Sequence, residues 1–236
     1  MKIKIICLED EKNIKFNNIS SKFEILGDNS FKKRAKYYNI EKNTVEVYYL
    51  MEKEEGINKY NLNSNSDMIL VLAKSLNHKN IERIKKIRSN YNIIVAVGEV
   101  NISNKDIKEE FNKLNNVIII NKLKKENTID LNLLVIMISN KEMFFNLNKQ
   151  KNTILIDSDE SIGKIVLSIL EQFNYIENNR EYNLYLYSKE EVGVQELAYL
   201  EDPIKEYIYN DAILRVNTVI DKNLKDKSYF LVATGK

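Results

Sequence analysis

Residues 68–120 read MILVLAKSLNHKNIERIKKIRSNYNIIVAVGEVNISNKDIKEEFNKLNNVIII, and short apolar runs alternate in them with helical patterns. The apolar runs are typical of buried strands and occupy residues 68–72, 93–97 and 117–120. Between them, residues 81–88 repeat isoleucine every third position and residues 106–114 are amphipathic, so both segments are predicted to be helices. Strands separated by helices of this length indicate βαβ units and a mostly parallel sheet.

The same alternation continues on both sides of this stretch and predicts an α/β fold in three parts. Residues 1–127 are expected to form a Rossmann-like, mostly parallel sheet domain, in which residues 30–62 carry no clear pattern. Residues 128–147 are expected to form a long, enclosed central helix, because residues 133–138 are apolar on nearly every side. Residues 148–236 are expected to form a second, smaller α/β domain that ends in a β-hairpin.

The composition excludes several classes of protein. The chain has 236 residues, of which 44% are hydrophobic and 30% charged, and its formal net charge is only +2, so no nucleic-acid partner is indicated. Cys7 is the single cysteine, which rules out an intramolecular disulfide and a cysteine-based zinc site. No signal peptide is apparent, and no apolar stretch approaches the ~20 residues that span a bilayer. We therefore expect a soluble, cytoplasmic protein without a membrane partner.

A resemblance to a known family appears near the end of the chain. Residues 217–226, NTVIDKNLKD, and residues 230–235, FLVATG, are similar to the final hairpin of FtsZ, the bacterial tubulin, with its pattern Ile-Asp-x-x-Leu-x-Asp and its exit Ala-Thr-Gly. Residues 66–71, SDMILV, resemble the strand that precedes the glycine-rich phosphate loop of that family. The resemblance covers the chain from about residue 66 to the end. It implies a nucleotide-type α/β half, a central helix and a second α/β half.

The phosphate-binding chemistry of the family is missing from the matching residues. A phosphate loop needs glycine so that backbone N–H groups can approach the ligand closely. After the first strand, this chain carries Glu9, Asp10 and Glu11, whose carboxylates would repel phosphate. We therefore expect no bound nucleotide and no other cofactor. The segment in place of the glycine-rich loop contains no glycine and consists of Ala73, Lys74, Ser75, Leu76, Asn77, His78, Lys79 and Asn80.

The catalytic loop of the family is also changed. In FtsZ, two aspartates in the pattern Asn-x-Asp-x-x-Asp act on the GTP of the neighbouring subunit, whereas residues 146–151 here read NLNKQK. The resemblance places Asn148 and Lys151 at the two aspartate positions, and neither residue is a general base at neutral pH. The chain is therefore predicted to be a pseudo-GTPase with no catalytic residue.

A protein of this kind is expected to act through protein–protein contacts in bacterial cell division or a related filament system. The partner is expected to be FtsZ or another FtsZ-like protein, whose filaments it would cap or modulate. Two alternatives remain open: a divergent nucleotide-binding protein or sensor of the tubulin superfamily, and a structural protein that self-associates without nucleotide. The candidate interaction face comprises Asn146, Asn148, Lys149 and Lys151.

Other chemistries are less well represented in the sequence. The start of the chain, KIKIICLEDEKNI, resembles a response-regulator receiver, in which Glu9 and Asp10 would hold Mg²⁺ and Lys122 would be the lysine, but no phosphoacceptor aspartate follows residue 72. His78 is the only histidine, so no multi-histidine metal site is possible. Asp159 and Glu160 are expected to open a helix rather than bind a metal. Arg83, Lys85, Lys86 and Arg88 are expected to form a solvated helix face.

Overall fold

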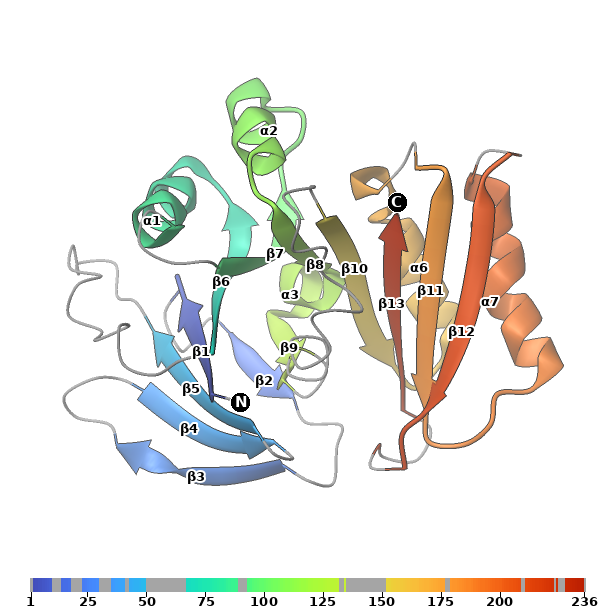
Figure 1. Cartoon of the computed structure of the whole chain (residues 1–236), viewed down its shortest axis with the longest axis horizontal. Helices are drawn as coiled ribbons and strands as arrows, with labels where there is room; N and C mark the ends of the chain where they lie inside the picture. Colours follow the sequence, from blue (N-terminus) through green and yellow to red (C-terminus); the bar gives the residue numbers. More distant parts are fainter. Residues whose placement is uncertain are drawn as a thin grey trace.

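The computed structural model describes most of the chain, and a single sheet runs through it (Figure 1). The described residues are 2–9, 14–17, 23–29, 35–40, 43–49, 67–88, 93–131, 134, 152–176, 179–208, 211–222, 224 and 228–235. Their strands form an 11-stranded sheet in the order β12-β11-β13-β10-β8-β7-β6-β1-β5-β4-β3, and a separate two-stranded sheet, β2-β9.

The middle of the large sheet is parallel, as the alternation of strands and helices predicts. Each strand in this part pairs in parallel with its neighbours. The strands are, in spatial order, β5 (Asn43–Tyr49), β1 (Lys2–Cys7), β6 (Met68–Leu76), β7 (Ile93–Val100), β8 (Asn116–Ile120) and β10 (Asn152–Asp159). At one end, β4 (Ala35–Ile40) and β3 (Phe23–Asn29) extend the sheet in antiparallel fashion. The predicted α/β fold with a mostly parallel sheet is therefore confirmed.

Helices cover the parallel strands, and the apolar core lies in two layers. One layer receives Val71 and Ala73 of β6, while the other receives Leu70 and Leu72, as expected for alternate residues of a strand. The described helices are α1 (His78–Arg88), α2 (Lys105–Asn112), α3 (Asn121–Glu126), α6 (Ile162–Leu170), the 3₁₀ helix η3 (Phe173–Tyr175) and α7 (Val194–Tyr207). None of them is long and apolar enough to cross a membrane.

The predicted C-terminal hairpin is wrong. Strand β12 (Ile213–Ile220) pairs in parallel with β11 (Glu181–Ser188), and β13 (Tyr229–Gly235) inserts antiparallel between β11 and β10. The two last strands therefore lie on opposite sides of β11 (Figure 1). The physical reason is burial: residues 230–233 are fully buried, which requires neighbours on both sides, whereas β12 alternates between half-buried and exposed residues.

The predicted helix over residues 128–147 does not begin at residue 128. Asn127 ends α3 in the left-handed conformation, with φ 54°, and β9 (Thr128–Asp130) then pairs in parallel with β2 (Lys15–Asn17). Thr128 and Ile129 are β-branched, which favours a strand when a partner is available. Leu131 and Leu134 are helical and fully buried, and residues 135–151 lie outside the described part of the chain.

The expected division at residues 127 and 148 remains a prediction. Strand β8 lies before the expected boundary and β10 lies after it. The two strands pair in parallel over Asn116–Ile120 of β8. The described strands on the two sides therefore belong to one hydrogen-bonded sheet.

Candidate functional site

The carboxyl ends of the parallel strands β1, β6 and β7 lie at the same end of the sheet, where ligands commonly bind in α/β folds. The segment expected to replace a phosphate loop is at this end of the strands, but it is not a loop. Strand β6 continues through Leu76, and Ser75 and Leu76 pair with Glu99 and Val100 of β7. Only Asn77 separates the strand from helix α1, which begins at His78. Without glycine, the chain passes from strand to helix without a wide turn.

Asn77 caps α1, and the exposed residues around it point to solvent. Its side-chain oxygen accepts a hydrogen bond from the Asn80 backbone N–H at 2.9 Å, an N-cap arrangement. Lys74, His78 and Lys79 are exposed, while Ala73 and Leu76 are buried in the core. The predicted segment is thus divided between the core and an exposed helix entrance.

Glu9 accepts two hydrogen bonds at this end of the sheet. Its Oε1 accepts the backbone N–H of Lys74 at 2.8 Å and the side-chain amide of Asn80 at 3.2 Å. The Asn80 amide also donates to the Ser75 carbonyl at 2.9 Å, and Arg83 donates to the Leu8 carbonyl at 2.9 Å. An internal carboxylate therefore takes an N–H that an external anion would need.

Burial raises the pKa of the Glu9 carboxyl, while the hydrogen bonds from Lys74 and Asn80 and the charge of Arg83 act in the opposite direction. The second oxygen, Oε2, is buried and has no hydrogen-bond partner among the described residues. From the sequence, Glu9 is expected to oppose phosphate through charge repulsion alone. The contact with Asn80 is not apparent in the sequence, because 71 positions separate the two residues. Arg83, expected on a solvated helix face, donates to the Leu8 carbonyl.

A second polar network joins α3 to α6 behind β10. The Ser168 hydroxyl donates to Asp157 Oδ2, and Asn121, almost fully buried, donates to Ser168 Oγ at 2.9 Å and to Glu171 Oε2 at 2.7 Å. Burial raises the pKa of Asp157, and the ion pair with Lys125 lowers that of Glu171. These bonds connect two helices to one strand, a structural role. Asp159 accepts the Ser161 N–H just before α6, as expected for a carboxylate that opens a helix.

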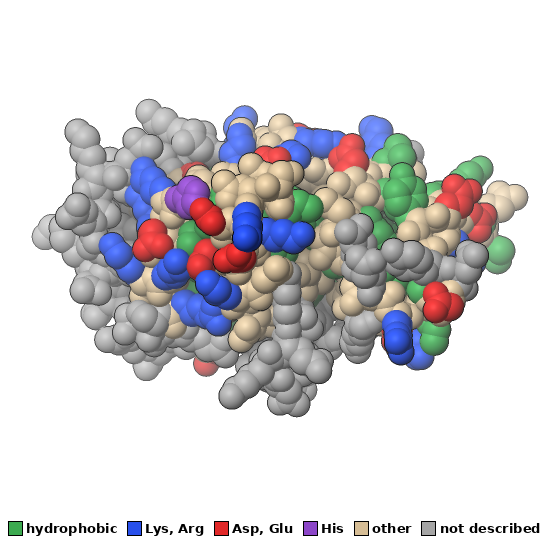
Figure 2. Space-filling view, turned by 90° about the horizontal axis from the view of Figure 1, so that it is seen from above, with side chains coloured by type: hydrophobic (Ala, Val, Ile, Leu, Met, Phe, Trp, Pro, Cys, Tyr) green, Lys and Arg blue, Asp and Glu red, His purple; other side chains and the backbone are tan. Residues whose placement is uncertain are grey.

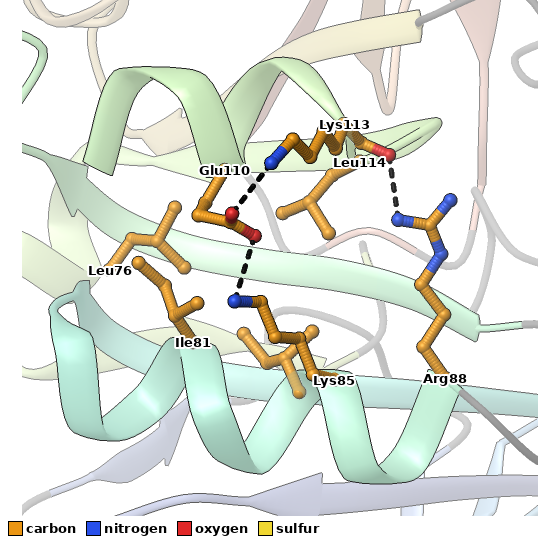
Figure 3. A pocket seen from close by; sticks show the side chains of 8 residues that line it. Leu76, Ile81, Lys85, Arg88, Glu110, Lys113 and Leu114 are labelled. Carbon is orange, nitrogen blue, oxygen red and sulfur yellow. Dashed lines mark hydrogen bonds and ion pairs between the residues drawn. The ribbon is translucent and has the colours of Figure 1, made fainter. Parts of the chain in front are cut away.

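A cavity of about 310 Å³ lies between α1 and α2 (Figure 3). Its apolar wall includes Leu76, Ile81, Ile84 and Leu114. Glu110 bridges Lys85 at 3.2 Å and Lys113 at 2.8 Å, and Arg88 donates to the Lys113 carbonyl at 2.7 Å. Lys85, Lys86 and Arg88 are exposed, as expected for a solvated face of α1, and the contacts of Lys85 and Arg88 also tie α1 to α2.

The remaining predicted site residues lie outside the described part of the chain. They are Asn146, Asn148, Lys149 and Lys151 of the predicted interaction face, and Asp10 and Glu11. Within the described part of the chain, no group of three or more His, Cys, Asp or Glu side chains could hold a metal ion. The described residues at this end of the sheet therefore offer an occupied backbone N–H and a capped helix, and they bring together no nucleophile and base.

Comparisons with known proteins give structural likenesses alone. No protein-family model matches the sequence, and no curated protein sequence matches it. Among solved structures, a point mutant of FtsZ from M. jannaschii is 14% identical with a TM-score of 0.39, and an empty FtsZ dimer from the same organism is 13% identical with a TM-score of 0.38. Each match covers 72% of this chain, which spans only 65% and 63% of the two FtsZ chains.

CetZ1 from Haloferax volcanii, a GDP-bound monomer, is 10% identical with a TM-score of 0.37 and covers 76% of this chain and 67% of its own. TM-scores below 0.5 do not assign this chain to a family. The fold class therefore rests on the strand order and helices of the chain itself.

Proposed function

We propose that this chain is a non-enzymatic protein of the FtsZ–tubulin type that acts through protein–protein contacts in a bacterial filament system. The observation that carries the proposal is the carboxylate of Glu9 on the backbone N–H of Lys74, at the strand-to-helix junction where the family binds phosphate. The similarity of residues 217–235 to the FtsZ C-terminus supports the choice of family. The proposed loss of GTP hydrolysis is supported by Asn148 and Lys151, which stand where the family has aspartates.

Two physical effects at the junction oppose nucleotide binding. A phosphate would have to displace Glu9 from Lys74 and Asn80, and it would then lie beside the Glu9 carboxylate, which carries charge of the same sign. The regular strand up to Leu76 also keeps the backbone of β6 engaged with β7, so no run of free N–H groups faces a ligand. The family reaches its phosphates with such a run.

The first test measures nucleotide binding by thermal shift. With GTP, GDP or ATP and Mg²⁺ at millimolar concentration, we expect the melting temperature of the wild-type chain to change by less than about 1 °C. A nucleotide present at 100 times its Kd would stabilise the folded state by about 2.7 kcal/mol, which a melting curve readily detects.

Glu9→Gln is the matched variant for this test. It removes the charge but keeps an oxygen that can accept the Lys74 N–H, so we expect no nucleotide shift in this variant either. A rise of several degrees in the wild-type chain would overturn the proposal. A rise in Glu9→Gln alone would mean that charge repulsion, rather than occupation of the donor, excludes the nucleotide.

The second test concerns the partner. We expect substoichiometric amounts of the chain to reduce the sedimentable fraction and the GTPase rate of FtsZ from the same host, because a subunit without GTP ends a head-to-tail filament. The double charge reversal Lys149→Glu and Lys151→Glu should weaken this effect severalfold, since these lysines are predicted to face the phosphates of the neighbour. Lys164→Glu, on the exposed surface of α6, is the matched control and should keep it. Unchanged sedimentation and GTPase rate would contradict capping.

A further inference from the structure

Among the described strands, β12 is the last one at its side of the large sheet. It pairs with β11 along Ile213–Ile220, and no described strand lies on its other side. Open edges offer unpaired backbone groups to another chain, and proteins usually protect them with lysine, proline or a bulge. Residues 213–220, ILRVNTVI, contain no lysine, no proline and no acidic residue, and the pairing with β11 is regular throughout.

Two hydrogen bonds show to which side each residue of β12 directs its backbone N–H and C=O groups. The N–H of Ile213 donates to the Arg180 carbonyl at 2.9 Å, and the N–H of Asp221 donates to the Ser188 carbonyl at 2.8 Å. Odd-numbered residues therefore bond to β11. In a regular parallel ladder, the alternate residues direct both N–H and C=O to the opposite side. The outward residues are Leu214, Val216, Thr218 and Ile220.

Apolar side chains gather at the same end of the molecule. Ile213 and Ile220, at the two ends of β12, are 53% and 54% exposed, and Tyr199 and Tyr207 of α7 are 70% and 63% exposed. Helix α7 lies beside β12 at this end (Figure 1), and Figure 2 shows hydrophobic side chains on the corresponding end of the surface. A partner that continues the sheet past β12 would thus meet apolar side chains next to the edge.

A second copy of the chain can pair with all the outward N–H and C=O groups of β12 in one specific register. If a two-fold axis passes at Asn217, the outward residues pair only with one another: Val216 faces Thr218 of the other copy, and Leu214 faces Ile220. All of their outward N–H and C=O groups are then paired. Side chains that face each other across such an axis lie on the same face of the sheet, so α7 of both copies covers one face of the joined sheet.

The charges in this register are complementary. Arg215, the only charged residue of β12, lies 3.5 Å from Glu181 of β11 in its own copy, and in this register it also faces Val219 of the second copy and lies diagonally from its Asp221. Diagonal neighbours in an antiparallel pair are about 7–8 Å apart, within reach of an arginine side chain. A two-fold axis at Arg215 would instead place two arginines opposite each other, which is unfavourable.

We propose that two copies of this chain pair antiparallel through β12 about a two-fold axis near Asn217, which joins their sheets into one. The proposal does not depend on the absence of nucleotide, because β12 and the Glu9 site lie in different parts of the sheet. A monomer result would leave the nucleotide and FtsZ tests unaffected.

The first experiment measures the mass of the full chain by analytical ultracentrifugation over a range of concentrations. We expect a reversible dimer. Thr218→Pro removes one outward N–H without touching the bonds to β11, and the side chain of Thr218 is exposed, so the variant should stay folded by circular dichroism and dimerise at least about tenfold more weakly. Thr218→Ala keeps the N–H and should dimerise like the wild type.

The second experiment is oxidative cross-linking. Asn217→Cys would place two thiols opposite each other across the axis, within the Cα separation that a disulfide tolerates. Cys7, the only natural cysteine, is buried and its burial raises the pKa of its thiol, so it should not compete. Glu109→Cys, on the exposed face of α2, is the control. A monomer at all concentrations, or cross-linking no faster at residue 217 than at residue 109, would overturn the proposal.

Discussion

Gly98→Val is expected to lower the free energy of unfolding by about 3 kcal/mol or more, in line with severe overpacking of a core. A Cβ atom at Gly98 would lie 2.7 Å from the Lys124 backbone nitrogen, 2.7 Å from the Lys74 carbonyl oxygen and 3.0 Å from the Leu123 carbonyl carbon. All three are backbone atoms, and they belong to β6 and α3, so none of them can move aside without shifting an element of the core. For a chain of this size the loss corresponds to a fall of roughly 6–12 °C in the melting temperature.

The matched control for Gly98 is Gly163→Ala. The added Cβ would meet only Ser161 Oγ at 3.9 Å, an ordinary contact, and alanine is preferred over glycine within a helix by up to ~1 kcal/mol. Urea unfolding of both variants measures the two changes in the free energy of unfolding. If Gly98→Val loses no more stability than Gly163→Ala, the close approach of β7 to α3 does not exist in solution. Because Gly98 touches the Lys74 carbonyl, a shift here would also disturb the N–H that Glu9 binds.

Phe230→Ala is expected to cost about 3–5 kcal/mol, the usual range for deleting a fully buried phenyl ring. Phe230 is 0% exposed, and its ring stacks on Tyr187 of β11 with centroids 4.4 Å apart and planes at 19°. Strand β13 lies between β10 and β11, and Phe230 belongs to the core layer that also contains Tyr187 and Val232, so the cavity would open in that layer, on one face of the sheet. Denaturant titration followed by circular dichroism measures the loss.

Leu167→Ala is the control for Phe230. Leu167 lies on α6 and is 65% exposed, so its truncation should change stability by less than about 0.5 kcal/mol. A similarly small loss for Phe230→Ala would mean that β13 lies at an edge of the sheet, as in the hairpin that the sequence suggested.

Local pattern sufficed for most of the strands and helices. The apolar run at residues 68–72 and the isoleucines of residues 81–88 correspond to parts of β6 and α1, because a strand or helix with one or two buried faces carries its period in the sequence. Local pattern failed to predict the secondary structure where a distant pairing partner determines it. Residues 128–130 form a strand because β2 lies beside them, and β2 is more than a hundred positions away in the sequence.

The sequence likewise predicts only part of the candidate site: its residue types, but not its hydrogen bonds. The absence of glycine between Ala73 and Asn80 and the acidic character of Glu9 are properties of the sequence, and they are sufficient to predict a lost phosphate loop. The hydrogen bonds of Glu9 to Lys74 and Asn80 are not visible there, because they arise from the parallel pairing of β1 with β6.

The sequence by itself therefore determined the α/β class, the approximate position of most elements and the absence of glycine from residues 73–80, since each depends on residue type and local period. Only the tertiary structure decided that β13 lies between β10 and β11 and that β12 is the last described strand on its side of the sheet. It also decided that the Glu9 carboxylate accepts the backbone N–H of Lys74 in β6. These features depend on which strands become neighbours, and strand order follows from burial and backbone hydrogen bonding across the whole sheet rather than from any single segment.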